Sequence, residues 1–127
     1  MALAAAVFLH LAVTLVHGAA HIGAAVALGP AALAFVIVVI QIGPLAGLAY
    51  ARAHPIAGAL AVAATMAAAL LFGLLNHFLV QGTDHVSHVA AEWRPLFEST
   101  AALLVVTEAA GVAAGLWGVS RAFGRVS

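Results

Sequence analysis

The sequence predicts an all-α fold: a polytopic integral membrane protein in which four transmembrane helices form a bundle. The first observation is composition, because 66% of the 127 residues are hydrophobic and only 6% are charged, whereas soluble domains carry about 25% charged residues. The second is a set of four apolar segments of about 20 residues or more, enough to cross a hydrocarbon core about 30 Å thick. Backbone groups in lipid must pair within their own segment, so these segments are expected to be helices of a single membrane domain, residues 1–127.

Glycine and proline mark the ends of the four helices. Gly29 and Pro30 separate the first helix from the second, and Pro55 begins the third, because proline is tolerated in the first turn of a helix. Pro44 lies inside the second helix, where it should kink the chain and free the carbonyl of Ile40. The expected helices span about residues 3–26, 31–52, 55–80 and 96–117.

The only connection longer than a tight turn is residues 81–95, between the third and fourth helices. Its length predicts a short capping helix or loop over one end of the bundle. On a helix in this segment, His85, His88 and Glu92 would share one face.

Small residues recur at a spacing of four in two helices. Gly43 and Gly47 lie in the second helix, and Gly111 and Gly115 lie in the fourth. Such pairs allow helix backbones to approach closely, so they predict tight contacts between neighbouring helices.

Arginine positions predict the orientation of the chain. Arg52, Arg121 and Arg125 lie on the side that holds both termini, whereas the opposite side has Arg94 alone. Because Lys and Arg are enriched in cytoplasmic loops, we expect a multi-pass protein of the cytoplasmic (inner) membrane with both termini in the cytoplasm. The histidine-rich loop then lies on the extracytoplasmic side.

Polar residues within the apolar segments predict one shared column. Four residues of the first helix are spaced by 4, 3 and 4 positions, which keeps them on one face: His10, Thr14, His17 and His21. His77 of the third helix lies at a depth similar to that of His17. Ionisable groups that face lipid cost about 2.5–3.5 kcal/mol each on the insertion scale, so we expect these side chains to face the bundle interior.

The column predicts a transition-metal site at the extracytoplasmic end of the bundle. Imidazole nitrogens and carboxylate oxygens suit iron, copper or zinc, and there are donors for one or two ions. If the centre is catalytic, Glu98 is the expected base, and a redox or oxygen-dependent reaction on a lipid-soluble substrate would fit a site at the bilayer edge. The expected metal donors are His17, His21, His77, Asp84, His85 and His88.

Other kinds of site are restricted by composition and spacing. Cysteine and lysine are absent, which excludes thiolate metal sites, disulfides and Schiff-base chemistry. The segments HGAAH and HVSH are similar to the histidine boxes of membrane di-iron hydroxylases, but the HxxHH pattern of that family does not occur. The sequence therefore assigns the chain to no family.

Two further functions are compatible with the same column. A b-type haem needs one imidazole from each of two facing helices, which His77 together with His10 or His17 would supply. A proton or ion path is indicated by His10, Gln41 and Glu108, which extend the column inward. Such a path would suit a small coupled transporter or an accessory subunit of a larger membrane complex.

The expected partners follow from size and charge. The lipid bilayer is one partner, and further copies of the chain or subunits of a membrane complex are others, because 127 residues are few for a complete transporter. The formal net charge is zero, so there is no basic surface for nucleic acid, and we expect no such partner.

Overall fold

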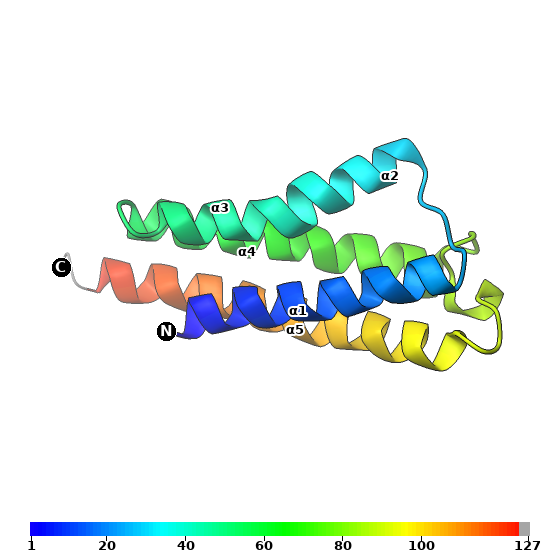
Figure 1. Ribbon diagram of the computed structural model, residues 1–127. Helices are drawn as coiled ribbons and strands as arrows, with labels where there is room; N and C mark the ends of the chain where they lie inside the picture. The colour runs from blue at the N-terminus through cyan, green and yellow to red at the C-terminus, as the bar shows by residue number, and fades with distance from the viewer. Residues whose placement is uncertain (125–127) are drawn as a thin grey trace.

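The computed structural model describes residues 1–124, which form four long helices arranged up and down (Figure 1). The first is α1 (Ala2–Gly23). The second consists of α2 (Pro30–Phe35), the π-helical segment η1 (Val36–Ile42) and α3 (Gly43–Tyr50). The third consists of α4 (Pro55–Gly73) and the π-helical segment η2 (Leu74–Leu79), and the fourth is α5 (Arg94–Phe123).

The predicted all-α fold is confirmed for the described residues, which contain no strand. The four long helices have 22, 21, 25 and 30 residues, and each is long and apolar enough to cross a membrane. The largest difference from the expected ends is in α5, which continues to Phe123 instead of ending near residue 117. Arg125, one of the residues that predicted the orientation, lies outside the described part of the chain.

The second long helix bends near Pro44. Proline has no N–H to donate to the carbonyl of Ile40, and this carbonyl instead accepts a hydrogen bond from His10 Nε2 of α1 at 3.1 Å. His10 therefore ties α1 to the second helix at the point where the backbone hydrogen bond is lost. On the N-terminal side of this bend, α2 diverges from the other helices, as the cyan ribbon in Figure 1 shows.

Glycines allow α4 to pack closely against α3 and α5. A Cβ atom at Gly47 would lie 2.9 Å from the backbone nitrogen of Val62, and a Cβ atom at Gly115 would lie 2.8 Å from the carbonyl oxygen of Ala59. No real side chain is accommodated at such distances without a shift of the backbone. The contacts predicted by the glycine pairs are thus confirmed for α3 with α4 and for α4 with α5.

A layer of buried polar side chains separates two apolar clusters. Val7, Val62 and Met66 pack together towards the end of the bundle that holds the start of α1. At the opposite end, Ala20 and Phe97 pack beneath the loop that joins α4 to α5. The polar residues between the clusters are His10, Thr14, His17, His77, Thr100, Thr107 and Glu108.

The connection between η2 and α5 is mostly loop. It contains one turn of 3-10 helix, η3 (Val86–His88), in place of a longer helix that would carry Glu92. His85 caps this turn, because its side chain accepts a hydrogen bond from the backbone N–H of Ser87. The shared face expected for His85, His88 and Glu92 is therefore not formed, since Glu92 lies beyond the end of the turn.

Candidate metal centre

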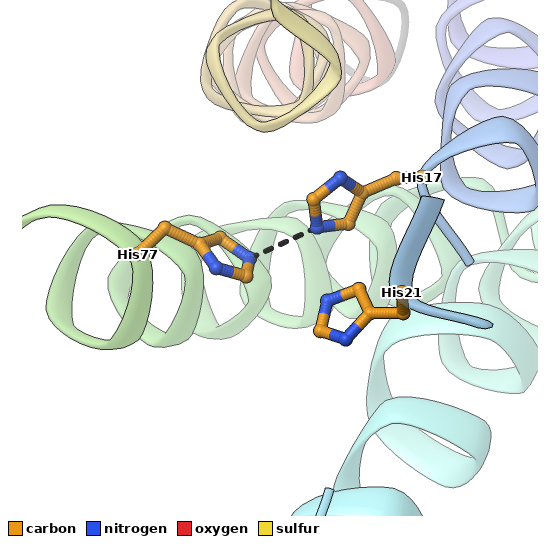
Figure 2. Close-up of side chains that lie close together, drawn as sticks. All are labelled: His17, His21 and His77. Atoms are coloured by element: carbon orange, nitrogen blue, oxygen red, sulfur yellow. Dashed lines mark hydrogen bonds between the residues drawn. The ribbon is translucent and has the colours of Figure 1, made fainter. Parts of the chain in front are cut away.

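Three histidines from two helices converge at the end of the bundle beneath the loop. His17 and His21 lie one turn apart on α1, and His77 lies on η2, sixty residues further along the chain. One ring nitrogen of each imidazole lies within 4.8 Å of the other two. Figure 2 shows the three rings pointing into the same space, with His17 Nε2 and His77 Nε2 only 3.2 Å apart.

Packing holds the three rings in place. The ring centroid of Phe97, on α5, lies 4.8 Å from that of His17, 4.8 Å from that of His21 and 5.4 Å from that of His77. His17 and His77 are each only 5% exposed. The aromatic side chain thus forms one wall of the cluster and limits the orientations that the imidazoles can adopt.

Each imidazole has an acceptor for its Nδ1 atom. His17 Nδ1 lies 2.8 Å from the hydroxyl of Thr100, His77 Nδ1 lies 3.1 Å from the carbonyl oxygen of Asp84, and His21 Nδ1 lies 3.3 Å from the carbonyl oxygen of Val26. A carbonyl oxygen only accepts, so the Nδ1 atoms of His77 and His21 must donate. The Thr100 hydroxyl donates to the carbonyl of Leu96 at 2.7 Å, so it accepts from His17.

These contacts favour the tautomer with the proton on Nδ1 for all three neutral imidazoles. With the proton on Nδ1, each Nε2 keeps an unshared electron pair. The Nε2 atoms of His17 and His77 then face each other at 3.2 Å as two acceptors, an arrangement that a shared cation stabilises. Two nitrogens bound to one tetrahedral metal at 2.0–2.1 Å would lie about 3.3 Å apart, close to this distance.

Asp84 lies beside this cluster and not within it. Its Oδ1 atom is 3.3 Å from His21 Nε2 and 3.3 Å from His77 Nδ1. The same oxygen is buried and forms no hydrogen bond. The set of converging donor atoms contains the three histidines without Asp84. Its carboxylate is therefore placed to act equally on His21 and on the Nδ1 side of His77.

A backbone turn after α1 supports His21. The N–H of Val26 donates to the carbonyl of His21 at 3.0 Å, and the N–H of Ala25 donates to the carbonyl of Ile22 at 3.2 Å. These two bonds form a Schellman motif, which requires a left-handed residue at Ala25, with φ of 54°. The motif folds Val26 back over the helix end, so that its own carbonyl reaches the His21 ring.

The three residues predicted to form a proton path lie deeper in the bundle. His10 Nδ1 and Glu108 Oε1 are 3.9 Å apart, and both side chains are almost completely buried. His10 Nδ1 and Glu108 Oε2 form no hydrogen bond. Gln41, on η1, lines the same cavity as Glu108.

The other predicted site residues lie outside the cluster. His85 accepts a hydrogen bond from Ser87 at Nδ1 and lies 3.2 Å from the carbonyl of Phe78 at Nε2, so both of its nitrogens hold the loop together. His88 is exposed and its Nδ1 is 2.6 Å from the carbonyl of Gly82. Glu98 is exposed on α5.

Thr100 and the carbonyl of Val26 are parts of the site that sequence reasoning missed. Thr100 precedes Glu108 by eight residues, a spacing that keeps two residues on similar faces of a helix. An inward-facing Glu108 therefore implied an inward-facing Thr100. No comparable signal marks Val26, because its role depends on the left-handed conformation of Ala25.

The fold and the cluster together define an all-helical protein with four segments able to span a membrane and a three-histidine site that could hold a metal ion. No protein-family model matches the chain, and no curated protein or solved structure matches it either.

Proposed function

We propose that this chain is a four-span membrane metalloprotein that binds one transition-metal ion through the Nε2 atoms of His17, His21 and His77. One observation carries the proposal: one ring nitrogen of each of the three imidazoles lies within 4.8 Å of the other two. Each Nδ1 atom also has an oxygen acceptor within 3.3 Å, which favours Nε2 as the metal-binding atom. Histidine ligands of metals characteristically donate their second ring N–H to a carbonyl, a carboxylate or another acceptor.

Asp84 has a supporting role in this proposal. Its carboxylate lies 3.3 Å from the Nδ1 atom of His77, where a negative charge makes the imidazole a stronger donor to a metal. Its main-chain carbonyl accepts the Nδ1 proton of the same ring. Asp84 thus acts as a positioning residue for His77, and its charge also offsets part of the charge of a buried cation.

The chemistry at the site follows from the number of donors. Zinc sites that carry out catalysis use three protein ligands and leave one place for water or substrate. Three imidazole nitrogens suit zinc, copper or iron. The cluster opens on a largely apolar cavity, which favours an apolar compound as the substrate of any redox or oxygen-dependent reaction.

Membrane insertion is supported by the outward-facing side chains of all four long helices. Leu15, Val38, Leu71 and Val106 are each more than half exposed. Contiguous apolar surface on this scale is unfavourable in water but suits a hydrocarbon environment. The arginine distribution supports an orientation with both termini in the cytoplasm and the metal site near the extracytoplasmic surface.

The geometry favours a non-haem metal over a b-type haem. Two axial imidazoles bind opposite faces of the haem iron, so their nitrogens must be about 4 Å apart if each bond is about 2 Å. His17 Nε2 and His77 Nε2 are 3.2 Å apart, too close for a macrocycle between them.

A proton path is the second candidate function. It is favoured by the buried pair of His10 and Glu108, whose facing atoms are 3.9 Å apart. Protons could pass between this pair and the cavity beside His77. Proton flux into liposomes that stops in Glu108→Gln, with normal metal content, would support this function and make the metal a structural element.

Metal analysis tests the main proposal. Protein purified without chelators and loaded with zinc, copper or iron should retain about one equivalent of one of them, and His17→Ala or His77→Ala should reduce the content to background. Bound metal should also raise the unfolding temperature, because a ligand at 100 times its Kd stabilises the folded state by about 2.7 kcal/mol.

Two other histidine variants serve as matched controls. His54→Ala and His88→Ala remove exposed imidazoles away from the cluster, so both should keep full metal content and the full thermal shift. Less than about a tenth of an equivalent of any metal in the wild-type protein, with no thermal shift, would rule out the metal site.

A further inference from the structure

A cavity of about 320 Å³ extends from the histidine cluster into the bundle. Its walls come from α1, η1, α4 and α5, with parts of α2, η2 and the loops that follow α1 and η2. Apolar side chains such as Val36, Phe72 and Leu104 form most of the wall. The cavity therefore suits a ligand with a largely apolar body.

The volume limits the size of the ligand. Small-molecule sites usually have volumes of about 300–1,000 Å³, and an engineered apolar cavity of about 150 Å³ binds benzene. A cavity of about 320 Å³ thus suits a body of about ten carbon atoms, much smaller than a two-chain lipid.

Glu108 supplies a polar contact in the cavity wall. The side chain is 2% exposed, and its Oε2 atom forms no hydrogen bond with any of the described residues 1–124. A buried polar atom without a partner is unfavourable, so this oxygen favours a ligand that can pair with it. Gly73 lies beside this oxygen, since a Cβ atom there would be in van der Waals contact with Glu108 Oε2 at 3.8 Å and with His77 Cδ2 at 3.9 Å.

A hydroxyl is the head group that fits this position best. It donates to a carboxylate and accepts from a protonated carboxyl, so it pairs with Glu108 in either protonation state. A carboxylate head would be repelled by an ionised Glu108, and an ammonium head would lose its hydration on entry. The preferred ligand is therefore an uncharged alcohol.

The cavity has its mouth between α1 and α2. Gly18 and Ile22 of α1 and Leu33 of α2 line the cavity, and all three are also exposed on the outer surface. Figure 1 shows that α2 diverges from α1 at this end of the bundle. An opening between two apolar helices faces the side of the bundle, where a bilayer would supply lipid-soluble molecules.

We infer that this cavity binds a small aliphatic alcohol of about ten carbons, which enters sideways between α1 and α2 and places its hydroxyl on Glu108. The direction of entry rests on the membrane placement proposed above. Binding itself uses the apolar wall and Glu108, so it does not require a metal on the histidines.

Photolabelling tests this inference on the full chain in phosphatidylcholine nanodiscs. The probe is a ten-carbon primary alcohol with a diazirine in its chain, compared with the matching diazirine alkane. Mass spectrometry should locate the alcohol's label on cavity residues that are not exposed on the outer surface, such as Val36, Phe72 and Leu104, and excess decan-1-ol should compete with it. Labelling is measured both before and after metal removal by a chelator.

Two pairs of variants connect the label to the cavity. Gly18→Leu places a side chain at the mouth, where an added Cβ meets no atom within 4 Å, so it should reduce labelling without steric conflict. The control Ala19→Leu adds the same side chain at an exposed position that does not line the cavity, and it should leave labelling unchanged.

In the wild-type protein, the alcohol should label the cavity about three to ten times more than the alkane does, which is the effect of one hydrogen bond. Glu108→Leu should reduce this ratio to about one. Glu108→Gln can still donate and accept, so it should keep most of the preference. Equal labelling by alcohol and alkane in the wild-type protein, or labels spread over all outer faces, would overturn the inference. Labelling that persists in chelated protein would support it even if the metal proposal failed.

Discussion

Thr100 favours a proton on Nδ1 of His17. Its hydroxyl donates to the carbonyl of Leu96 at 2.7 Å and accepts from His17 Nδ1 at 2.8 Å. Reversing the second bond would require the hydroxyl to give up the first. A single residue on α5 thus directs the electron pair of His17 towards His77.

Removal of this hydroxyl should weaken metal binding without unfolding the protein. Thr100→Val keeps the shape of the side chain but leaves His17 Nδ1 without its acceptor. Loss of such a supporting partner reduces metal affinity by about 10–100-fold. Competition with a chromogenic chelator measures the affinity directly.

Thr107→Val is the matched control on the same helix. The Thr107 hydroxyl is also buried, but among the described residues it bonds only to the backbone carbonyl of Leu104 at 3.1 Å. This variant should keep wild-type affinity. An equal loss in both variants would show that buried hydroxyls of α5 matter for packing alone.

Part of the cluster could be predicted from residue spacing. His17 and His21 are four residues apart, so they share a helix face, and the depth of His77 brings it to the same level. The sequence could not reveal the bonds to Thr100 and Val26, because they depend on the rotation of α5 and on the left-handed turn at Ala25. The sequence also contained no sign that Asp84 would lie beside the three converging histidines instead of among them.

At the level of elements, segment length and proline positions were sufficient to predict the four long helices. The two π-helical segments were not predictable, because one extra residue per turn depends on tertiary contacts and not on local propensity. Both segments contribute to the cavity wall, through Gln41 on η1 and His77 on η2. Irregular helix geometry therefore coincides with the candidate site.

Close packing of α4 against α5 should depend on Gly115. A Cβ atom there would lie 2.8 Å from the carbonyl oxygen of Ala59, so Gly115→Leu must push the helices apart. We expect a loss of roughly 1–3 kcal/mol in the free energy of unfolding, the usual cost of overpacking. Unfolding in mixed micelles with increasing fractions of denaturing detergent measures this loss.

The exposed position two residues earlier provides the control. Ala113→Leu introduces the same side chain on the outer face of α5, where it should change stability little. Similar destabilisation by both variants would mean that leucine disturbs α5 wherever it is introduced, and would contradict a specific contact at Gly115.

At the level of the whole molecule, the proposed membrane insertion leads to a test of topology. A fluorescent reporter that matures only in the cytoplasm should be active when fused to either terminus, since four spans return the chain to its starting side. A reporter active only outside the cytoplasm should instead work when inserted at Gly82, in the loop near the cluster. The opposite pattern would invert the orientation predicted from the arginines.

The bond between His17 and Thr100 also joins the first helix to the last. The two residues are 83 positions apart, and a ribosome adds about 5–20 residues per second, so roughly 4–17 seconds pass between their synthesis. During that interval no residue of α5 is present to orient the His17 ring. On the metal-site proposal, we therefore expect loading to be a late step of biogenesis that follows synthesis of the start of α5.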